Sequence, residues 1–309
     1  MKIVFMGTPD FAVPSLDILL KNGYDIVGVV TATDKWGGRG NKTLLESDVK
    51  KYALEKGLKI LQPEKLSDPE FIEELRSLGA ELQVVVAFRM LPTKVWSMPR
   101  LGTMNLHGSL LPKYRGAAPI NWAIINGEKE TGVTTFLLQH EIDTGDILFQ
   151  SKTEIGEDEL VGEVYERLMY IGAELVYKSV TALDKGVINP IPQSNETACP
   201  APKIFHETCK INFNQSAEKV HNFVRGLSPH PVAWTVFDGE KIKIYRTKKI
   251  NQETKLPAGR IETDGKKYLR ITCAEGCIEI LELQPDKRKR MDIKSFLNGT
   301  HINSESVEM

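Results

Sequence analysis

The first part of the chain alternates short apolar runs with segments of helical pattern. Apolar runs at residues 2–5, 25–31, 58–61 and 82–87 predict strands, and residues 15–20, 46–56 and 69–78 predict the helices between them. Runs that are apolar throughout are typical of parallel strands whose two faces are both buried. We therefore expect an α/β fold with a doubly wound, Rossmann-like and mostly parallel sheet.

The first loop of this sheet, residues 7–11, argues against a nucleotide-binding oxidoreductase. It reads Gly-Thr-Pro-Asp-Phe and lacks the G-x-G-x-x-G spacing that lets a backbone approach a pyrophosphate. In open sheets of this kind, ligands bind beyond the carboxyl ends of the strands. The loops that follow Ala87 and His107 leave such ends, so we expect the ligand site there.

The composition changes after a long helical pattern at residues 158–183. Residues 189–205 contain Pro190, Pro192, Pro200 and Pro202 and predict a linker. Beyond it, apolar and charged residues alternate at 233–237, 241–245, 268–272 and 277–283, which indicates half-buried antiparallel strands. We expect a domain at 1–188, the linker at 189–205, and a small β-barrel of oligonucleotide-binding (OB) type at 206–309.

The charge and the cysteine spacing exclude few classes of binding partner. The formal net charge is −1, but residues 206–309 hold 18 Lys+Arg against 14 Asp+Glu. This basic excess is compatible with a polyanionic binding partner and equally with an ordinary solvated surface. The four cysteines lack the paired C-x-x-C spacing of metal sites, so we expect no metal. The sequence shows neither a signal peptide nor a membrane-spanning run, and we expect a cytoplasmic monomer that binds neither DNA nor membrane.

An amide and an imidazole lie two residues apart, at Asn105 and His107, near the end of a predicted strand. Side chains two apart on a strand share a face, and Gly108 with Ser109 then signals a turn. A carboxylate follows at Asp143, in the run IDTGD at 142–146. The amide can donate to an oxyanion, the imidazole can move a proton and the carboxylate can orient the imidazole, which suits acyl transfer. Without further context, a capped turn explains the same residues.

A second group of residues lies in the loop at 33–42, which contains three cations, three glycines and Trp36. The cations are Lys35, Arg39 and Lys42. A solvated surface loop is the simpler interpretation, while an exposed Trp beside cations is also suited to stacking on an unpaired base. The run at 287–290 fits phosphate contacts or a solvated turn equally well.

The sequence NLHGSLLPKYRGAAPI at 105–120, followed by IDTGD, resembles the formyltransferase family that uses 10-formyltetrahydrofolate. The opening MGTPDF at 6–11 and the C-terminal domain resemble the members of this family that act on methionyl-tRNA. The resemblance extends over essentially the whole chain and is most specific in the central motif. It implies an enzyme that formylates the α-amino group of initiator methionyl-tRNA for translation initiation, with a C-terminal tRNA-binding domain.

The resemblance also implies which residues carry the reaction. The reacting trio falls on Asn105, His107 and Asp143, and not on Asp146. Folate is expected beside two segments, whose residues are Ser109, Leu110, Leu111, Pro112, Phe88, Arg89 and Met90. Many relatives have Gly after the aromatic residue of the second segment, where this chain has Arg89. Arg39 matches the basic residue that enters the acceptor end of the tRNA, and Lys35 and Lys42 lie beside it.

Other acceptors and another class of protein stay open. Formyltransferases that act on amino-sugar nucleotides share the trio and can carry a similar barrel, whereas glycinamide ribonucleotide enzymes end roughly where the linker begins. The basic loop around Arg39 favours tRNA as the acceptor. A non-catalytic RNA-binding protein with a decayed folate site is the rival from another class, and the intact trio argues against it.

Overall fold

The computed structural model describes residues 1–37, 40, 42–250 and 256–308, and these divide into two compact units. Unit 1 comprises Met1–Gly116, Gly132–Thr153 and Tyr165–Pro200. Unit 2 comprises Ala117–Thr131, Glu154–Val164 and Ala201–Met309. Two short segments that come before residue 165 therefore belong to the same unit as the C-terminal strands.

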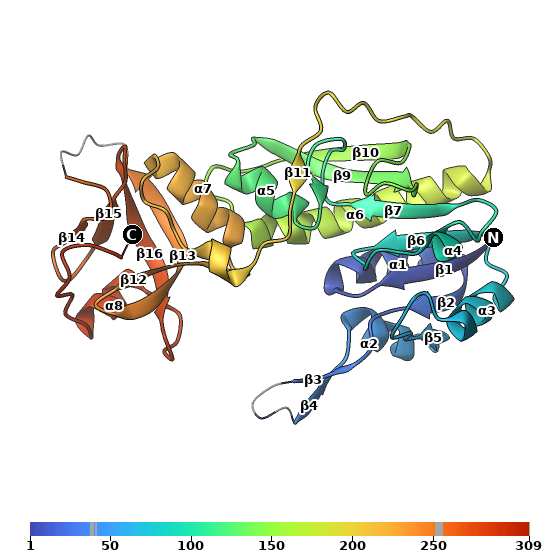
Figure 1. Cartoon of the computed structure of the whole chain (residues 1–309), viewed down its shortest axis with the longest axis horizontal. Helices are drawn as coiled ribbons and strands as arrows, with labels where there is room; N and C mark the ends of the chain where they lie inside the picture. Colours follow the sequence, from blue (N-terminus) through green and yellow to red (C-terminus); the bar gives the residue numbers. More distant parts are fainter. Residues whose placement is uncertain (38–39, 41, 251–255, 309) are drawn as a thin grey trace. The chain divides into compact units, whose positions relative to one another are not determined.

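Unit 1 is built on one seven-stranded sheet (Figure 1). Five strands are mutually parallel: β1 (Lys2–Gly7), β2 (Asp25–Val30), β5 (Ile60–Leu61), β6 (Leu82–Val86) and β7 (Thr103–His107). They are joined by β9 (Glu130–Leu137), which runs antiparallel to β7, and by β10 (Ile147–Glu154). The strand order is β10-β9-β7-β6-β1-β2-β5, which confirms the predicted Rossmann-like, mostly parallel sheet.

Helices connect and cover these strands. They are α1 (Val13–Lys21), α2 (Asp48–Glu55), α3 (Pro69–Ser77), the short α4 (Thr93–Trp96) and α6 (Val161–Asp184). A 3₁₀ turn at Asp10–Ala12 leads directly into α1. The central strand β1 is buried on both faces, since Ile3 and Val4 on opposite faces are each fully inaccessible. On one face, Val4 and Met6 pack with Leu75 of α3 in a shared core.

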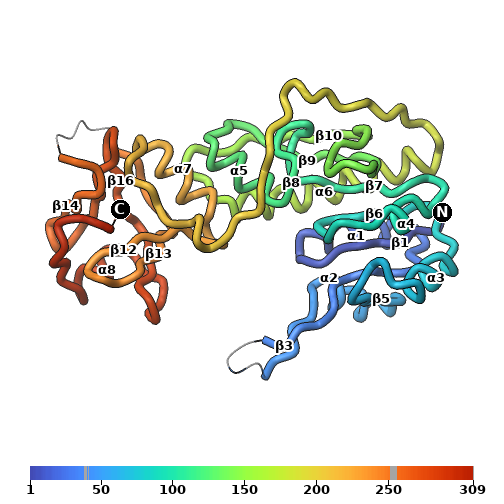
Figure 2. The backbone as a smooth tube through the Cα atoms, in the orientation of Figure 1, coloured from blue at the N-terminus to red at the C-terminus, as the bar shows by residue number. Residues whose placement is uncertain are grey.

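The segment between β2 and α2 differs from the loop and helix that the sequence predicts. A hairpin of β3 (Lys35–Gly37) and β4 (Thr43–Leu45) comes first, and Figure 2 shows it extending away from the sheet of unit 1. The helix then begins at Asp48 rather than residue 46, because the Ser47 side chain accepts a hydrogen bond from the Lys50 amide and caps it there.

Unit 2 is built on a curled antiparallel sheet, which confirms the predicted barrel-like C-terminal fold. Its strands are β12 (Ala233–Phe237), β13 (Glu240–Ile250), β14 (Ile261–Thr263), β15 (Leu269–Thr272), β16 (Cys277–Pro285) and β17 (Met291–Asp292). The order is β12-β13-β16-β15-β14, with β17 beside β16. The register of β13 against β16 shifts on either side of Arg246, an irregularity of the kind that bends a strand.

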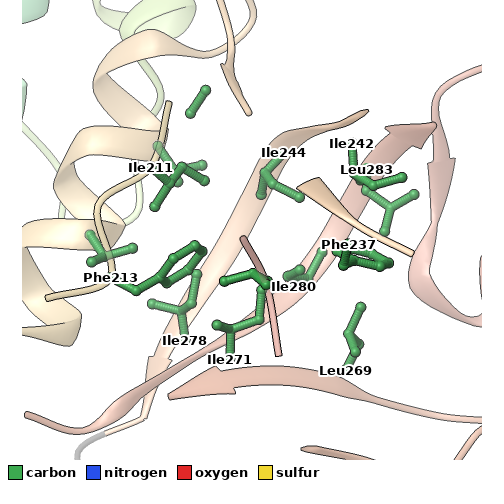
Figure 3. Close-up of a cluster of buried hydrophobic side chains, with 14 of the residues drawn as sticks. Ile211, Phe213, Phe237, Ile242, Ile244, Leu269, Ile271, Ile278, Ile280 and Leu283 are labelled. Carbon is green, nitrogen blue, oxygen red and sulfur yellow. The ribbon is translucent and has the colours of Figure 1, made fainter. Parts of the chain in front are cut away.

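The concave side of this sheet holds a separate apolar core. Phe213, Phe237 and Ile280 lie within it (Figure 3). The core also takes in residues of α7 (Ala217–Leu227) and α8 (Ile293–Asn298), while α5 (Pro119–Ile125) packs against α7. Across the described part of the chain, none of the helices has the length and apolar character needed to span a membrane.

Candidate active site

Strand β7 places Asn105 and His107 on one face of the unit 1 sheet. Leu106 points to the opposite face, where it packs on Gly172 of α6. The approach is so close that a Cβ on residue 172 would lie 2.7 Å from Leu106 Cδ2. His107 is 6% exposed and Asn105 is half-buried. The Asn105 side-chain amide has no hydrogen-bond partner among the residues that the structure describes, so its donors are available to a ligand.

The two ring nitrogens of His107 have different partners. Nε2 lies 2.8 Å from the backbone carbonyl oxygen of Tyr114. A carbonyl only accepts, so Nε2 carries a proton and donates it, and in the neutral ring the lone pair is on Nδ1. Nδ1 faces Asp143 Oδ2 at 3.7 Å, which is too long for a hydrogen bond. The Tyr114 carbonyl thus holds the tautomer, and Asp143 faces the nitrogen that can accept a proton.

The loop between β9 and β10 brings Asp143 to this position. Its Oδ2 accepts a hydrogen bond from the Gly116 amide at 2.9 Å, and its side chain is 14% exposed. Two residues later the loop passes against the end of β9, where a Cβ on Gly145 would lie only 1.7 Å from the Leu137 carbonyl oxygen. Only glycine permits this close approach. Asp146 contributes its backbone carbonyl to the Leu137 amide rather than a side chain to His107.

Three loops near the trio contain non-glycine residues in the left-handed backbone region. Ala87 follows β6 with φ of 48°, Tyr114 follows β7 with φ of 61°, and Asp143 follows β9 with φ of 55°. Such conformations cost on the order of 1 kcal/mol or more and tend to occur at functional sites. At Tyr114 and Asp143 the conformation accompanies the two contacts that His107 makes.

The predicted folate segment after β7 is held by an internal network. Ser109 is fully buried, and its hydroxyl donates to the Lys113 carbonyl at 2.6 Å. The Thr134 hydroxyl donates to the Ser109 carbonyl at 2.6 Å and accepts from the Leu111 amide at 3.0 Å, while Gln150 Nε2 donates to the Leu111 carbonyl at 2.8 Å. The Ser109 hydroxyl therefore shapes the loop. Sequence reasoning missed Thr134 and Gln150, because neither lies in a recognisable motif.

The second predicted folate segment follows β6. The Arg89 guanidinium donates to the carbonyls of Pro63 and Glu64, the latter at 2.8 Å, so it is turned toward a neighbouring loop. Phe88 is half-buried against the unit 1 core, and Met90 is 79% exposed. The segment thus combines an anchored Arg89 with an exposed Met90.

A glutamine in the predicted linker supports the Asp143 loop. Gln193 Nε2 donates to the carbonyls of Asp143 at 3.0 Å and Gly145 at 2.7 Å. Its Oε1 accepts from Arg115 Nε at 3.2 Å and from the terminal guanidinium nitrogen at 2.8 Å, and Arg115 also donates to Asn195 at 2.8 Å. This segment comes after α6 and lies beside the start of β10, where Ile191 bridges to Ile147 (Figure 2). Its Pro-rich composition gave no signal of the role of Gln193.

The basic loop belongs to the β3–β4 hairpin. Lys35, Trp36 and Lys42 are exposed there, and Trp36 is 65% exposed. Arg39, the residue predicted to contact tRNA most directly, lies outside the described residues.

Solved structures share this fold. An N-formyltransferase from Helicobacter canadensis, solved with folinic acid and dTDP-3-aminofucose, superposes with a TM-score of 0.70 over 94% of this chain and 100% of that chain. Its sequence is 22% identical, so the likeness concerns the fold alone. HypX from Aquifex aeolicus, solved with tetrahydrofolic acid, gives a TM-score of 0.63 over 97% of this chain and 48% of its own.

Sequence comparisons are more specific. Residues 1–180 match the family model described as formyl transferase, and residues 203–301 match that of the formyl transferase C-terminal domain. A methionyl-tRNA formyltransferase of Bacteroides fragilis is 50% identical over 100% of this chain and 98% of that protein. One from Phocaeicola vulgatus is 53% identical over 97% of this chain and 95% of its own length. The chain therefore belongs to the formyl transferase family and, within it, to the methionyl-tRNA formyltransferases.

Proposed function

We propose that the chain transfers the formyl group of 10-formyltetrahydrofolate to the α-amino group of initiator methionyl-tRNA. One observation carries the proposal. His107 has its Nε2 proton held by a backbone carbonyl and its Nδ1 turned toward Asp143, beside the unpartnered amide of Asn105 on the same strand face. This arrangement provides a proton acceptor, a countercharge and an oxyanion donor in one place.

The reaction then follows from these groups. The neutral α-amine attacks the formyl carbon, a C–N bond forms, and the carbonyl oxygen becomes an oxyanion that receives a hydrogen bond from the Asn105 amide. The attacking nitrogen gives a proton to Nδ1 of His107, and the Asp143 carboxylate stabilises the resulting imidazolium. The imidazolium returns this proton to the folate nitrogen as its bond to the formyl carbon breaks. The products are formylmethionyl-tRNA and tetrahydrofolate.

Donor binding is assigned to the loops after β6 and β7. Because the Ser109 hydroxyl is committed to Lys113, we propose that Leu110 and Pro112, which are both partly exposed, make the side-chain contacts of that segment. Phe88 and Met90 provide apolar surface on the other segment, and Arg89 fixes its backbone. The proposed reaction includes no metal, since Asn105 stabilises the oxyanion and His107 transfers the proton.

Acceptor binding is assigned to the β3–β4 hairpin and to the C-terminal sheet. Arg39, Lys35 and Lys42 supply cations for backbone phosphates, and Trp36 supplies a stacking surface. The excess of basic residues after His206 suits the same polyanion. We propose that the enzyme acts as a monomer in the cytoplasm, where charged tRNA is available.

The direct test offers the protein 10-formyltetrahydrofolate with one of three acceptors and follows transfer of labelled formyl. The acceptors are methionyl initiator tRNA, methionyl elongator tRNA and a dTDP-amino sugar. We expect rapid transfer to the initiator tRNA, slower transfer to the elongator tRNA and none to the sugar. Preferential transfer to the sugar would instead assign the chain an acceptor of the class that was solved bound to its Helicobacter structural neighbour.

A further inference from the structure

The base of the β3–β4 hairpin is closed by a group of side chains outside the trio. Asp34 precedes β3, Glu46 follows β4, and the Lys50 ammonium lies between their carboxylates. Lys50 Nζ contacts Asp34 Oδ2 closely and lies 2.8 Å from Glu46 Oε1. Gln62 Nε2 donates to the other Asp34 oxygen at 2.9 Å. One cation therefore ties both legs of the hairpin together.

The position of Lys50 in its helix is unfavourable without this contact. It is the third residue after the Ser47 cap, where Glu and Gln are favoured because their side chains accept from the backbone amide of the cap. A cation is disfavoured there, because the helix N-terminus carries partial positive charge. A lysine there is offset by the carboxylates that flank it. Hydrogen bonding to Asp34 raises the pKa of Lys50, and hydrogen bonding from Lys50 lowers the pKa of Asp34.

The helix that carries Lys50 is firmly attached to unit 1. Val49 and Ala53 of α2 are fully buried. The Thr31 and Ser47 hydroxyls, at the two roots of the hairpin, lie 2.7 Å apart. By contrast, every residue of β3 and β4 except Gly37 is exposed, and an isolated two-stranded hairpin is marginal in water. The direction in which the hairpin points is therefore set at its base.

We propose that Lys50, Asp34, Glu46 and Gln62 form a clamp that positions the hairpin for the acceptor tRNA. The proposal rests on the function proposed above, because it assumes that the exposed Lys35, Trp36 and Lys42 engage the tRNA. Lys50 acts as a positioning residue through the hairpin and touches no reacting atom. Its substitution therefore affects the KM for methionyl-tRNA and leaves the KM for the formyl donor unchanged.

The test compares Lys50→Met with Lys51→Met. Lys51 is the adjacent lysine of α2, and its ammonium pairs with Asp48 of the same helix at 3.0 Å rather than with the hairpin. We expect Lys50→Met to raise the KM for methionyl-tRNA about tenfold, the size of effect expected when other hairpin orientations become populated. Lys51→Met should stay within twofold of wild type. Lys50→Arg, which keeps the charge, should recover most of the loss.

A second measurement follows the hairpin directly, by trypsin cleavage between residues 35 and 42 in the intact protein. We expect cleavage there to be about tenfold faster in Lys50→Met than in Lys51→Met. Without the clamp, the pairing of β3 with β4 opens more often, and the protease cleaves an unpaired backbone more readily. Equal cleavage rates and equal KM values in the two variants would overturn the proposal. If Lys50→Met does not fold, Asp34→Asn, which weakens one leg only, takes its place. A wild-type protein that cannot formylate methionyl-tRNA would refute the proposed function, and the cleavage rates would still decide whether the clamp exists.

Discussion

Substitution of Gln193 should disturb the position of Asp143 while leaving the trio intact, because the Gln193 side chain binds the backbone of the Asp143 loop. Substitution of Gln193 by Ala removes the two hydrogen bonds to the carbonyls of Asp143 and Gly145, at 3.0 and 2.7 Å, and the two from Arg115. The Asp143 loop then keeps its contacts to Gly116 and to the end of β9. We expect the loop to remain folded but to move Asp143 away from His107 more often.

The magnitude follows from the bonds that are lost. Each hydrogen bond to a neutral carbonyl contributes about 1 kcal/mol net, so the loop loses roughly 2 kcal/mol of support. This raises the equilibrium constant for loop displacement roughly 30-fold, since about 1.4 kcal/mol corresponds to a factor of ten. The remaining contacts keep the Asp143 loop beside His107 in a fraction of the molecules. We therefore expect kcat to fall about tenfold with little change in the KM for the formyl donor.

The assay is a double-mutant cycle of kcat with Gln193→Ala, Asp143→Ala and the double variant. If Gln193 acts through Asp143, the double variant should be no slower than Asp143→Ala alone. Asn195→Ala is the matched control, since the Asn195 side chain accepts from the same Arg115 but forms no hydrogen bond to the described residues of the loop. Fully additive losses, or an equal loss in Asn195→Ala, would refute the coupling.

Three other predictions concern separate parts of the chain. Asn105→Ala should lower kcat roughly 10²-fold and leave folate affinity unchanged, because it removes the amide that we propose as the hydrogen-bond donor to the oxyanion; turnover measured alongside a folate titration checks both values. Arg39→Ala should weaken tRNA-dependent activity and leave folate binding unchanged, as initial rates at varied tRNA and varied donor would show. Burial lowers the pKa of His221 and outweighs the opposite effect of Asp158. As the pH falls, His221 is therefore protonated in the unfolded chain before it is protonated in the folded protein. The stability that neutral His221 contributes is therefore present above about pH 6.5 and lost as the pH falls through the lowered value. Urea unfolding between pH 7 and 5 should show less loss of stability in His221→Gln than in wild type or in the exposed control His301→Gln.

Periodicity accounts for the parts of the fold that were predictable. The uniformly apolar β1 and β6 indicated buried parallel strands, and the spacing of Asn105 and His107 placed both side chains on one face of β7. The alternating C-terminal strands likewise indicated an antiparallel sheet. These features depend on neighbours within a few residues of one another, which a sequence displays directly.

The features that escaped prediction depend on contacts between distant residues. The bonds of Gln193 to the Asp143 loop join positions 48 and 50 residues apart, and nothing in a Pro-rich segment marks one glutamine as different. The β3–β4 hairpin has short strands of exposed residues, so it lacks the apolar alternation that identifies a strand. The role of Lys50 becomes visible only when its helix position is considered together with Asp34 and Glu46.

The proposed reaction requires the Asp143 carboxylate to stabilise a protonated His107 during formyl transfer to methionyl-tRNA. Asp143→Asn isolates this requirement, because the Asn side chain keeps an oxygen that can accept from the Gly116 amide but carries no charge. The measurement is the single-turnover rate of formyl transfer, with both substrates saturating, together with the Kd of the donor. We predict a rate at least about tenfold below wild type with the Kd unchanged, since His107 loses its countercharge. A single-turnover rate within twofold of wild type would show that His107 needs no countercharge from Asp143.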